Sequence, residues 1–181
     1  MLILPKEPHI LRLAVGRLWN GNVSTDDHLA CLCEFFQNAE GIVVRVIIPT
    51  LPNEKKPNIS RGSRLNSIDE YDSVNILFVD EDNQYLEVIF GLGGSYLVRG
   101  FDTPGHLITD FSNESFSFIY ERDKDYISHM EMLIPYDFFP THLKAINAFL
   151  FTNDQCLAYH PLSGDVLNIH QPSVFPFVKM E

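Results

Sequence analysis

Residues 69–101 read DEYDSVNILFVDEDNQYLEVIFGLGGSYLVRGF, and this stretch decides the fold class. It consists of three strand-like runs and two turns: 73–79, 85–90 and 95–99, with an acidic turn at 80–83 and a glycine-rich turn at 91–94. In the middle run the apolar residues at positions 86, 88 and 90 alternate with Tyr85, Glu87 and Ile89. A period of two predicts a strand with one buried face and one partly exposed face.

The rest of the chain repeats this pattern of short strands and turn signals. The spacing is typical of β-sandwiches and barrels, and helical periodicity is nearly absent. We therefore predict an all-β fold, an antiparallel β-sandwich of about ten strands with at most one or two short helices. The best candidate for a helical turn is residues 141–146. With 181 residues, we expect a single sandwich domain over residues 1–181.

Residues 49–67 interrupt the pattern. The segment contains three prolines, at positions 49, 52 and 57, together with several basic and small polar residues. Proline cannot donate a hydrogen bond to a strand ladder, so the segment is predicted to be a long surface loop within the domain. Loops of this length often either cover a functional site or are mobile.

The composition limits the classes of partner. The chain has 24 acidic and 13 basic residues, which gives a formal net charge of −11. Nucleic acids and anionic membrane surfaces bind clustered Lys and Arg, so neither is expected as a partner of this acidic protein. The sequence has no apolar run long enough for a membrane helix, and the apolar run before Pro5 is too short for a signal peptide. We expect a cytoplasmic, soluble protein.

The three cysteines are expected to be reduced. Cys31 and Cys33 would lie on the same side of one strand, where a bridge between them would be strained. No Cys-x-x-Cys motif accompanies them. Packed thiols are therefore favoured over a metal or redox pair.

Motifs for catalysis, cofactors and metals are largely absent. The sequence has no nucleophile elbow, no His-Glu-x-x-His and no P-loop, and the acidic clusters do not fit an EF-hand loop. The glycine-rich turn at 91–94 leads into a strand rather than a helix, so it is predicted to be a hairpin turn and not a phosphate site. No cofactor and no metal are expected. His129 and Glu131 share one face of a strand and are the candidate acid–base pair of an enzyme, the least favoured hypothesis.

A sugar site would need an exposed aromatic ring with polar groups beside it. Trp19, the single tryptophan, is followed by a tight-turn signal. Tyr71, Tyr85 and Glu87 lie on or near the predicted exposed face of the central strands, and Arg99 is close to them in the chain. The alternative is that these aromatic residues only pack against their neighbours in the strands.

Several short motifs occur in an order found in one family. They are Trp19-Asn20-Gly21, Gln84-Tyr85-Leu86-Glu87-Val88 before a glycine turn, Ile134-Pro135-Tyr136-Asp137-Phe138-Phe139-Pro140, Ile146-Asn147-Ala148-Phe149, and Ile169-His170-Gln171-Pro172 before Phe175. The chain in this respect resembles uncharacterised protein family 462, a set of small intracellular eukaryotic proteins. That family resembles carbohydrate-binding module family 9 and the DOMON-like β-sandwiches. The resemblance covers nearly the whole chain.

The resemblance implies a jelly-roll-like, non-catalytic sandwich that holds a small ligand, which in the module family is a sugar. The module family has a tryptophan shortly before a Val-Glu pair on the strand that leads into the first central turn. Asp69 and Val74-Asn75 stand at those places here, so the stacking aromatic and the sugar-binding carboxylate are replaced. Tyr71, two positions from Asp69 and therefore on the same face of a strand, is the candidate substitute for the aromatic.

The leading prediction is a non-enzymatic domain that recognises a carbohydrate or another small ligand. Its candidate ligand-binding residues are Tyr71, Asn75, Tyr85, Glu87 and Arg99, with Trp19 as a further candidate. The alternative is a protein-interaction domain whose sugar site has degenerated. The two differ in geometry, because a binding module needs a concave pocket with converging polar groups, whereas an interaction domain needs a flat apolar patch.

Overall fold

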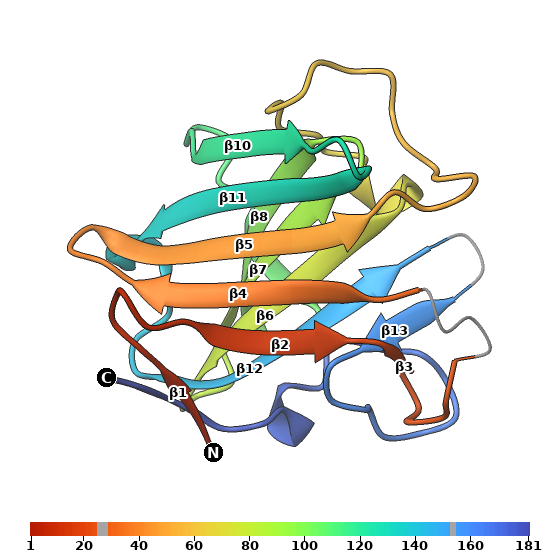
Figure 1. The fold of residues 1–181 in the computed structure, drawn as a ribbon. Coiled ribbons are helices and arrows are strands. Elements are labelled where there is room, and N and C mark those ends of the chain that lie inside the picture. Colours follow the sequence, from red (N-terminus) through yellow and green to blue (C-terminus); the bar gives the residue numbers. More distant parts are fainter. Residues whose placement is uncertain (25–28, 153–154) are drawn as a thin grey trace.

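The computed structural model describes residues 1–24, 29–152 and 155–181. Two antiparallel sheets face each other in a sandwich (Figure 1). The five-stranded sheet has the order β10 (Ser117–Arg122), β11 (Ile127–Pro135), β5 (Gly41–Pro49), β4 (Cys31–Gln37), β2 (Leu11–Val15). The seven-stranded sheet has the order β3 (Arg17–Leu18), β13 (Cys156–Ala158), β12 (Leu143–Phe151), β6 (Ser73–Asp80), β7 (Tyr85–Gly91), β8 (Ser95–Thr103), β9 (His106–Thr109). The predicted all-β sandwich is confirmed.

Two further strands and three short helical turns complete the described elements. β1 (Leu2–Leu4) and β14 (Val178–Met180) form a parallel pair near the two ends of the chain (Figure 1). The helical turns are of the 3-10 type: η1 (Ile68–Glu70), η2 (Tyr136–Phe138) and η3 (Pro172–Val174). The helical turn predicted at 141–146 is wrong, because β12 begins at Leu143 and pairs with β6. No helix among the described residues is long and apolar enough to cross a membrane.

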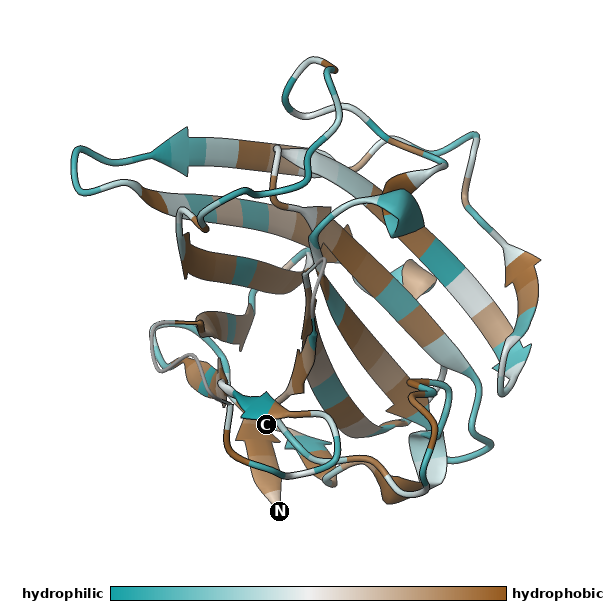
Figure 2. Cartoon of the chain, turned by 90° about the vertical axis from the view of Figure 1, so that its right-hand side faces the viewer, coloured by the Kyte–Doolittle hydropathy of each residue, from teal (hydrophilic) through white to brown (hydrophobic). Residues whose placement is uncertain are grey.

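The main core lies between the two sheets. Along β7 the alternation places Leu86, Val88 and Phe90 on this inner side, as predicted, and the same two-residue period is visible as alternating bands along the strands (Figure 2). Phe78 of β6 lies at the centre and makes edge-to-face contacts with Phe35 and Phe139, at ring-centroid distances of 5.9 and 5.1 Å. Such pairs add stability beyond the burial of their surface.

The three cysteines are free thiols and are buried, as predicted. Cys31 and Cys33 both contribute to the core between the sheets. Cys156 belongs to a second apolar cluster, and burial raises the pKa of its thiol to about 12. A thiol that stays protonated is a poor nucleophile, so Cys156 acts as a small apolar residue.

The turn between β7 and β8 depends on glycine. Gly94 has a φ of +91°, a conformation that other residues rarely adopt, and its N–H donates to the carbonyl of Gly91 over 2.8 Å. A Cβ on Gly91 would lie 2.2 Å from the hydroxyl oxygen of Ser95. The glycine-rich stretch is thus a hairpin turn, as the sequence predicts.

The outer face of the seven-stranded sheet is covered at both of its ends. At one end Leu162 and Phe175, from the chain that follows β13, pack against outward-facing residues such as Leu77 and Phe149. At the other end Ile68 packs against residues of β7 and β8. Between the two ends Glu87 is buried beside Asn75 and Arg99. Strand β7 is thus buried along its whole length, and the prediction that one of its faces is partly exposed is wrong.

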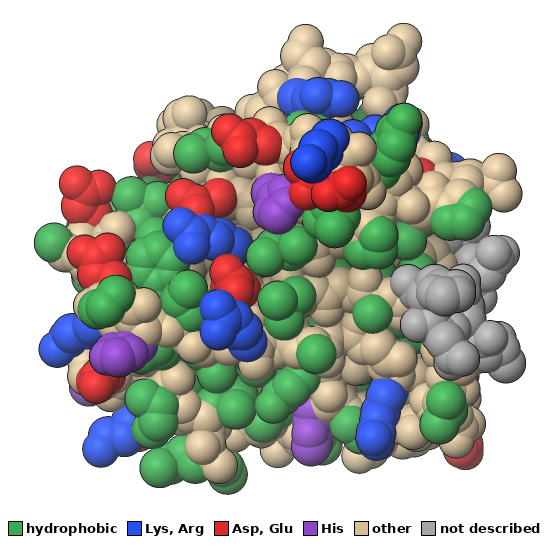
Figure 3. Space-filling view, viewed as in Figure 1, with side chains coloured by type: hydrophobic (Ala, Val, Ile, Leu, Met, Phe, Trp, Pro, Cys, Tyr) green, Lys and Arg blue, Asp and Glu red, His purple; other side chains and the backbone are tan. Residues whose placement is uncertain are grey.

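The outer face of the five-stranded sheet carries a row of alternating charges. Arg12, Glu34, Arg45 and Glu131 are direct cross-strand neighbours on β2, β4, β5 and β11. Arg12 donates to Glu34 over 2.8 Å, and Arg45 donates to Glu131. Basic and acidic side chains alternate down this face in Figure 3. Opposite charges in directly paired positions stabilise adjacent strands.

Replacing Phe78 by alanine should lower the free energy of unfolding by about 3–5 kcal/mol, because it removes a ring that is fully buried between the sheets. Urea unfolding followed by circular dichroism measures the change. Ile119→Ala, at a half-exposed position of β10, is the matched control and should cost about 1 kcal/mol or less. Equal losses for the two variants would contradict the placement of the core.

Candidate functional site: a polar cleft on the outer face of the seven-stranded sheet

An open cleft of about 650 Å³ lies on the outer face of the seven-stranded sheet. It lies between the two covered ends of that face, with Leu162 and Phe175 packed at one end and Ile68 at the other. Its floor is formed by polar residues of β6, β7 and β8, and its walls come from the loop before β6, the chain after β8, the end of β12 and the segment before η3. The lining residues are Lys55, Asp69, Glu70, Tyr71, Asp72, Ser73, Asn75, Glu87, Arg99, Phe101, Gly105, Leu107, Phe151, Thr152, Ile169 and His170.

A continuous hydrogen-bonded chain runs across the floor. Ser73 donates to the Oδ1 of Asn75 over 2.8 Å, and the Nδ2 of Asn75 donates to the Oε1 of Glu87 over 2.9 Å. The Nε of Arg99 donates to the Oε2 of Glu87 over 2.9 Å. The Nη1 and Nη2 of Arg99 then donate to the two oxygens of Asp69, over 2.7 and 3.0 Å. Each link is fixed by strand register or by the turn η1, so the floor is preorganised.

The solvent exposure of the side chains rises along this hydrogen-bonded network from Glu87 to Asp69. The side chain of Glu87 is 0 % exposed, that of Arg99 is 18 % exposed and that of Asp69 is 56 % exposed. Burial lowers the pKa of Arg99, but the nearby carboxylates of Glu87 and Asp69 outweigh this effect and raise it above its ordinary value. The guanidinium is therefore a permanent cation that compensates a carboxylate sealed beneath it. Asp69 presents the outer, solvent-facing end of the network.

His170 and Tyr85 form a second polar contact beside the floor. The hydroxyl of Tyr85 accepts the backbone N–H of Gly105 over 2.8 Å and lies 2.7 Å from the Nδ1 of His170. Burial raises the pKa of Tyr85 to about 12, so the hydroxyl keeps its proton. Burial also lowers the pKa of His170, against the attraction of Glu87. The Nδ1 of a neutral His170 then accepts a hydrogen bond from the hydroxyl of Tyr85, and its Nε2 carries the ring proton.

Tyr71 supplies an aromatic ring at the wall. Tyr71 follows η1 directly. Its neighbour Asp72 makes two hydrogen bonds with Lys55 of the long loop. The N–H of Asp72 donates to the carbonyl of Lys55, and the N–H of Lys55 donates to the carboxylate of Asp72, each over 2.9 Å. The Nζ of Lys55 lies 5.9 Å from the centre of the Tyr71 ring. The loop therefore forms one wall of the cleft.

The structure brings four of the six candidate residues together. Tyr71, Asn75, Glu87 and Arg99 all line the cleft. Tyr85 does not line it, because its ring is buried under Phe101, with centroids 4.6 Å apart, and only its hydroxyl reaches His170. Their roles in ligand binding stay predictions.

Trp19 lies outside this cleft. Its ring packs against the apolar cluster on the outer face, and its backbone is hydrogen-bonded to Cys156 and Leu162. This position agrees with the alternative considered for the aromatic residues, in which they pack against their neighbours.

Three residues with charged or polar roles in the site, Asp69, His170 and Lys55, are among the lining residues that were not predicted from the sequence. Asp69 sits in an acidic stretch that also contains Glu70 and Asp72, and the spacing alone does not show which carboxylate faces Arg99. His170 is brought to the cleft only by the return of the chain after β13. Lys55 arrives on the long loop, and its contact with Tyr71 carries no local signal.

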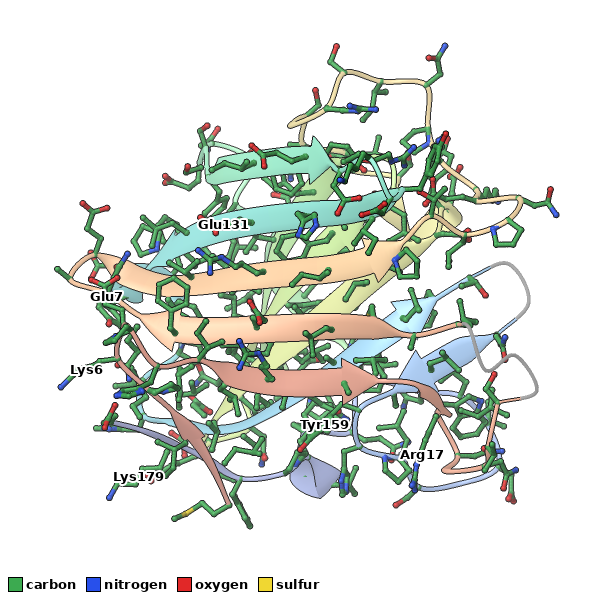
Figure 4. The ribbon with its side chains drawn as sticks, viewed as in Figure 1. Lys6, Glu7, Arg17, Glu131, Tyr159 and Lys179 are labelled. Carbon is green, nitrogen blue, oxygen red and sulfur yellow. The ribbon has the colours of Figure 1, made fainter. Side chains whose placement is uncertain are left out.

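The candidate acid–base pair is placed on the opposite sheet. His129 is exposed, and its Nε2 lies 3.3 Å from the Oδ2 of Asp123. Glu131, labelled on β11 in Figure 4, accepts a hydrogen bond from Arg45. The two side chains line a shallow hollow of about 350 Å³. Each is engaged by a different partner.

The aspartates of the acidic turns accept hydrogen bonds from backbone N–H groups. Asp80 accepts the N–H groups of Asp82 and Gln84, and Asp123 accepts those of Asp125 and Ile127. Within residues 1–24, 29–152 and 155–181, no three His, Cys, Asp or Glu side chains converge as metal ligands. These carboxylates close tight turns.

No family model and no curated protein matches the chain. Among solved structures, it is similar to a crystal structure described as that of a "putative carbohydrate-binding protein" from Bacteroides uniformis. The TM-score is 0.72 at 12 % sequence identity, over 95 % of this chain and 87 % of that chain. At this identity the likeness establishes the shared fold alone.

Replacing Arg99 by methionine should lower the free energy of unfolding by about 3–5 kcal/mol, because it leaves the buried carboxylate of Glu87 without a countercharge. The double variant Glu87→Gln/Arg99→Met should recover a large part of the loss. Denaturant unfolding of the single and double variants measures the coupling. Additive losses would contradict the pairing.

The stability contributed by His170 should depend on pH. Because the folded state lowers the pKa of His170, the unfolded chain binds more protons once the pH falls below the ordinary histidine value of about 6.5. The protein should therefore lose stability between about pH 7 and about pH 5. His170→Asn, which keeps an acceptor near Tyr85, should lose less over this range. Parallel curves of urea midpoint against pH for the two proteins would contradict the prediction.

Proposed function

We propose that the cleft binds a polyhydroxylated small ligand of the carbohydrate class and that the protein acts without catalysis. The observation that carries the proposal is the polar floor that ends in Arg99 and Asp69. Arg99 donates one hydrogen bond to Glu87 and two to Asp69, and its Nη2 also lies 2.9 Å from the Oε2 of Glu87. A guanidinium has five N–H groups, so among the described contacts one N–H of Nη1 is left for a ligand. The carboxylate of Asp69 keeps acceptor capacity on its exposed side.

A donor and an acceptor side by side suit neighbouring hydroxyl groups. Each hydroxyl can donate to the carboxylate of Asp69 and accept from the guanidinium of Arg99, and charged partners make these hydrogen bonds strong. The ring of Tyr71 offers an apolar surface for the C–H face of a sugar ring. Apolar side chains at the rim, among them Leu107 and Ile169, help to exclude water.

Two likenesses support this class of ligand. The similar fold from Bacteroides uniformis is described as a "putative carbohydrate-binding protein". The order of sequence motifs resembles family 462 and, through it, carbohydrate-binding module family 9. The proposed site departs from the module family, because Tyr71 takes the place of the tryptophan and Asn75 stands where that family has the glutamate of its Val-Glu pair.

The outer face of the five-stranded sheet supports a second candidate function, a protein-interaction surface. Ile119 and Ile47 lie there beside the row of alternating charges. The charges of that row already pair with one another across the strands, which leaves less for a partner to satisfy. The cleft, with the remaining N–H of Arg99 and the exposed carboxylate of Asp69, is therefore the stronger candidate.

Neutral mono- and disaccharides should bind with dissociation constants of about 0.1–1 mM, and isothermal titration calorimetry or ligand-observed NMR measures them. Asp69→Asn and Tyr71→Ala should each weaken binding by about tenfold, since each removes one of the two contacts proposed above. Asp125→Asn, in an exposed turn of the other sheet, is the matched control and should bind as the wild type does. A panel of mono- and disaccharides, neutral and charged, without any binder would refute the proposed function.

A further inference from the structure

The cleft is acidic even though it contains Arg99. Four carboxylates and two cations line it, which leaves a formal charge of −2: Asp69, Glu70, Asp72 and Glu87 against Lys55 and Arg99. His170 adds no positive charge at neutral pH because burial lowers its pKa. A negative field in a concave site attracts cations and repels anions.

The positive charge of Arg99 is largely satisfied within the protein. Its guanidinium faces Glu87 on one side and Asp69 on the other. Glu70 is exposed and, within the described part of the chain, makes no ion pair. An incoming ligand therefore meets carboxylate charge at the wall before it meets an uncompensated cation.

The Tyr71 ring already faces an ammonium group. The Nζ of Lys55 lies 5.9 Å from the ring centre, within the range at which a cation is attracted by the face of an aromatic ring. Lys55 is exposed and its side chain has four rotatable bonds, so its ammonium can move away. An aromatic ring flanked by carboxylates is the environment that recognises ammonium ligands.

From this arrangement we infer that the ligand of the cleft carries a protonated amine beside its hydroxyl groups, as in an amino sugar or an amino polyol. The inference rests on the proposed function, since it assigns a charge to the ligand of the same site. The amine lies against Tyr71 and the neighbouring acidic wall, where it displaces the ammonium of Lys55. The hydroxyls lie on Asp69 and Arg99. Sugars that carry a carboxylate are rejected.

The test is a titration of the wild-type protein with glucosamine, glucose, N-acetylglucosamine and glucuronate, at a pH where the amine is protonated. Glucosamine should bind about tenfold more tightly than glucose or N-acetylglucosamine, and glucuronate at least about tenfold more weakly than glucose. Added salt should reduce the advantage of glucosamine and leave the affinity for glucose nearly unchanged, because salt screens the charge.

Lys55→Met tests the competition directly. Removing the ammonium of Lys55 frees the ring and makes the cleft more negative, so the advantage of glucosamine over glucose should grow by about threefold to tenfold. Lys179→Met is the matched control, because Lys179 is exposed on β14 near the chain ends and does not line the cleft (Figure 4). Its affinities should equal those of the wild type.

The outcomes separate the two proposals. If glucose binds and glucosamine binds no more tightly, the inferred amine is wrong and the proposed function stands. If glucosamine and N-acetylglucosamine bind equally well, the charge is not recognised and the inference is also wrong. If none of the four sugars binds, both proposals fall. These titrations of the wild type need no variant to fold.

Discussion

The seven-stranded sheet has apolar packing on both of its faces, and this packing determines where a polar cleft can form. Its inner face packs against the five-stranded sheet, while Leu162 and Phe175 cover one end of its outer face and Ile68 covers the other. What the covers leave open is a short polar stretch across the three central strands. There the side chains are too polar to be buried under an apolar layer, and they satisfy one another laterally instead. The cleft is the gap between two apolar covers.

Within that gap the buried carboxylate of Glu87 determines the arrangement of the other side chains. A charge with no exposed surface is tolerated only with close partners, and Asn75 and Arg99 supply them from the two adjacent strands. Because Arg99 is held from below, its free edge points outward to Asp69. A site assembled this way is rigid before a ligand arrives, which lowers the entropy lost on binding.

The sequence predicts the strands better than it predicts their surroundings. The alternation of Leu86, Val88 and Phe90 identifies β7 and its inner face, because strand periodicity is local. Whether the other face of β7 is buried depends on segments distant along the chain. The sequence therefore assigns Tyr85 and Glu87 to the outer face but does not show that they are buried. For the same reason Tyr71, Asn75, Glu87 and Arg99 could be named together, whereas His170 and Lys55 could not. Trp19 is the opposite case, because a single tryptophan is a plausible sugar-stacking residue in the sequence, but its ring packs against an apolar cluster outside the cleft.

The row of charges on the five-stranded sheet has a consequence for strand alignment. Arg12, Glu34, Arg45 and Glu131 stand directly opposite one another in four adjacent strands. A slip of one residue between any two of these strands would turn a charged side chain toward the apolar interior. A slip of two residues would set Glu34 beside aliphatic neighbours such as Val43 or Ile47 of β5 and separate it from Arg45. The row of charges therefore favours the native register, because the misaligned pairings of these strands have a higher free energy.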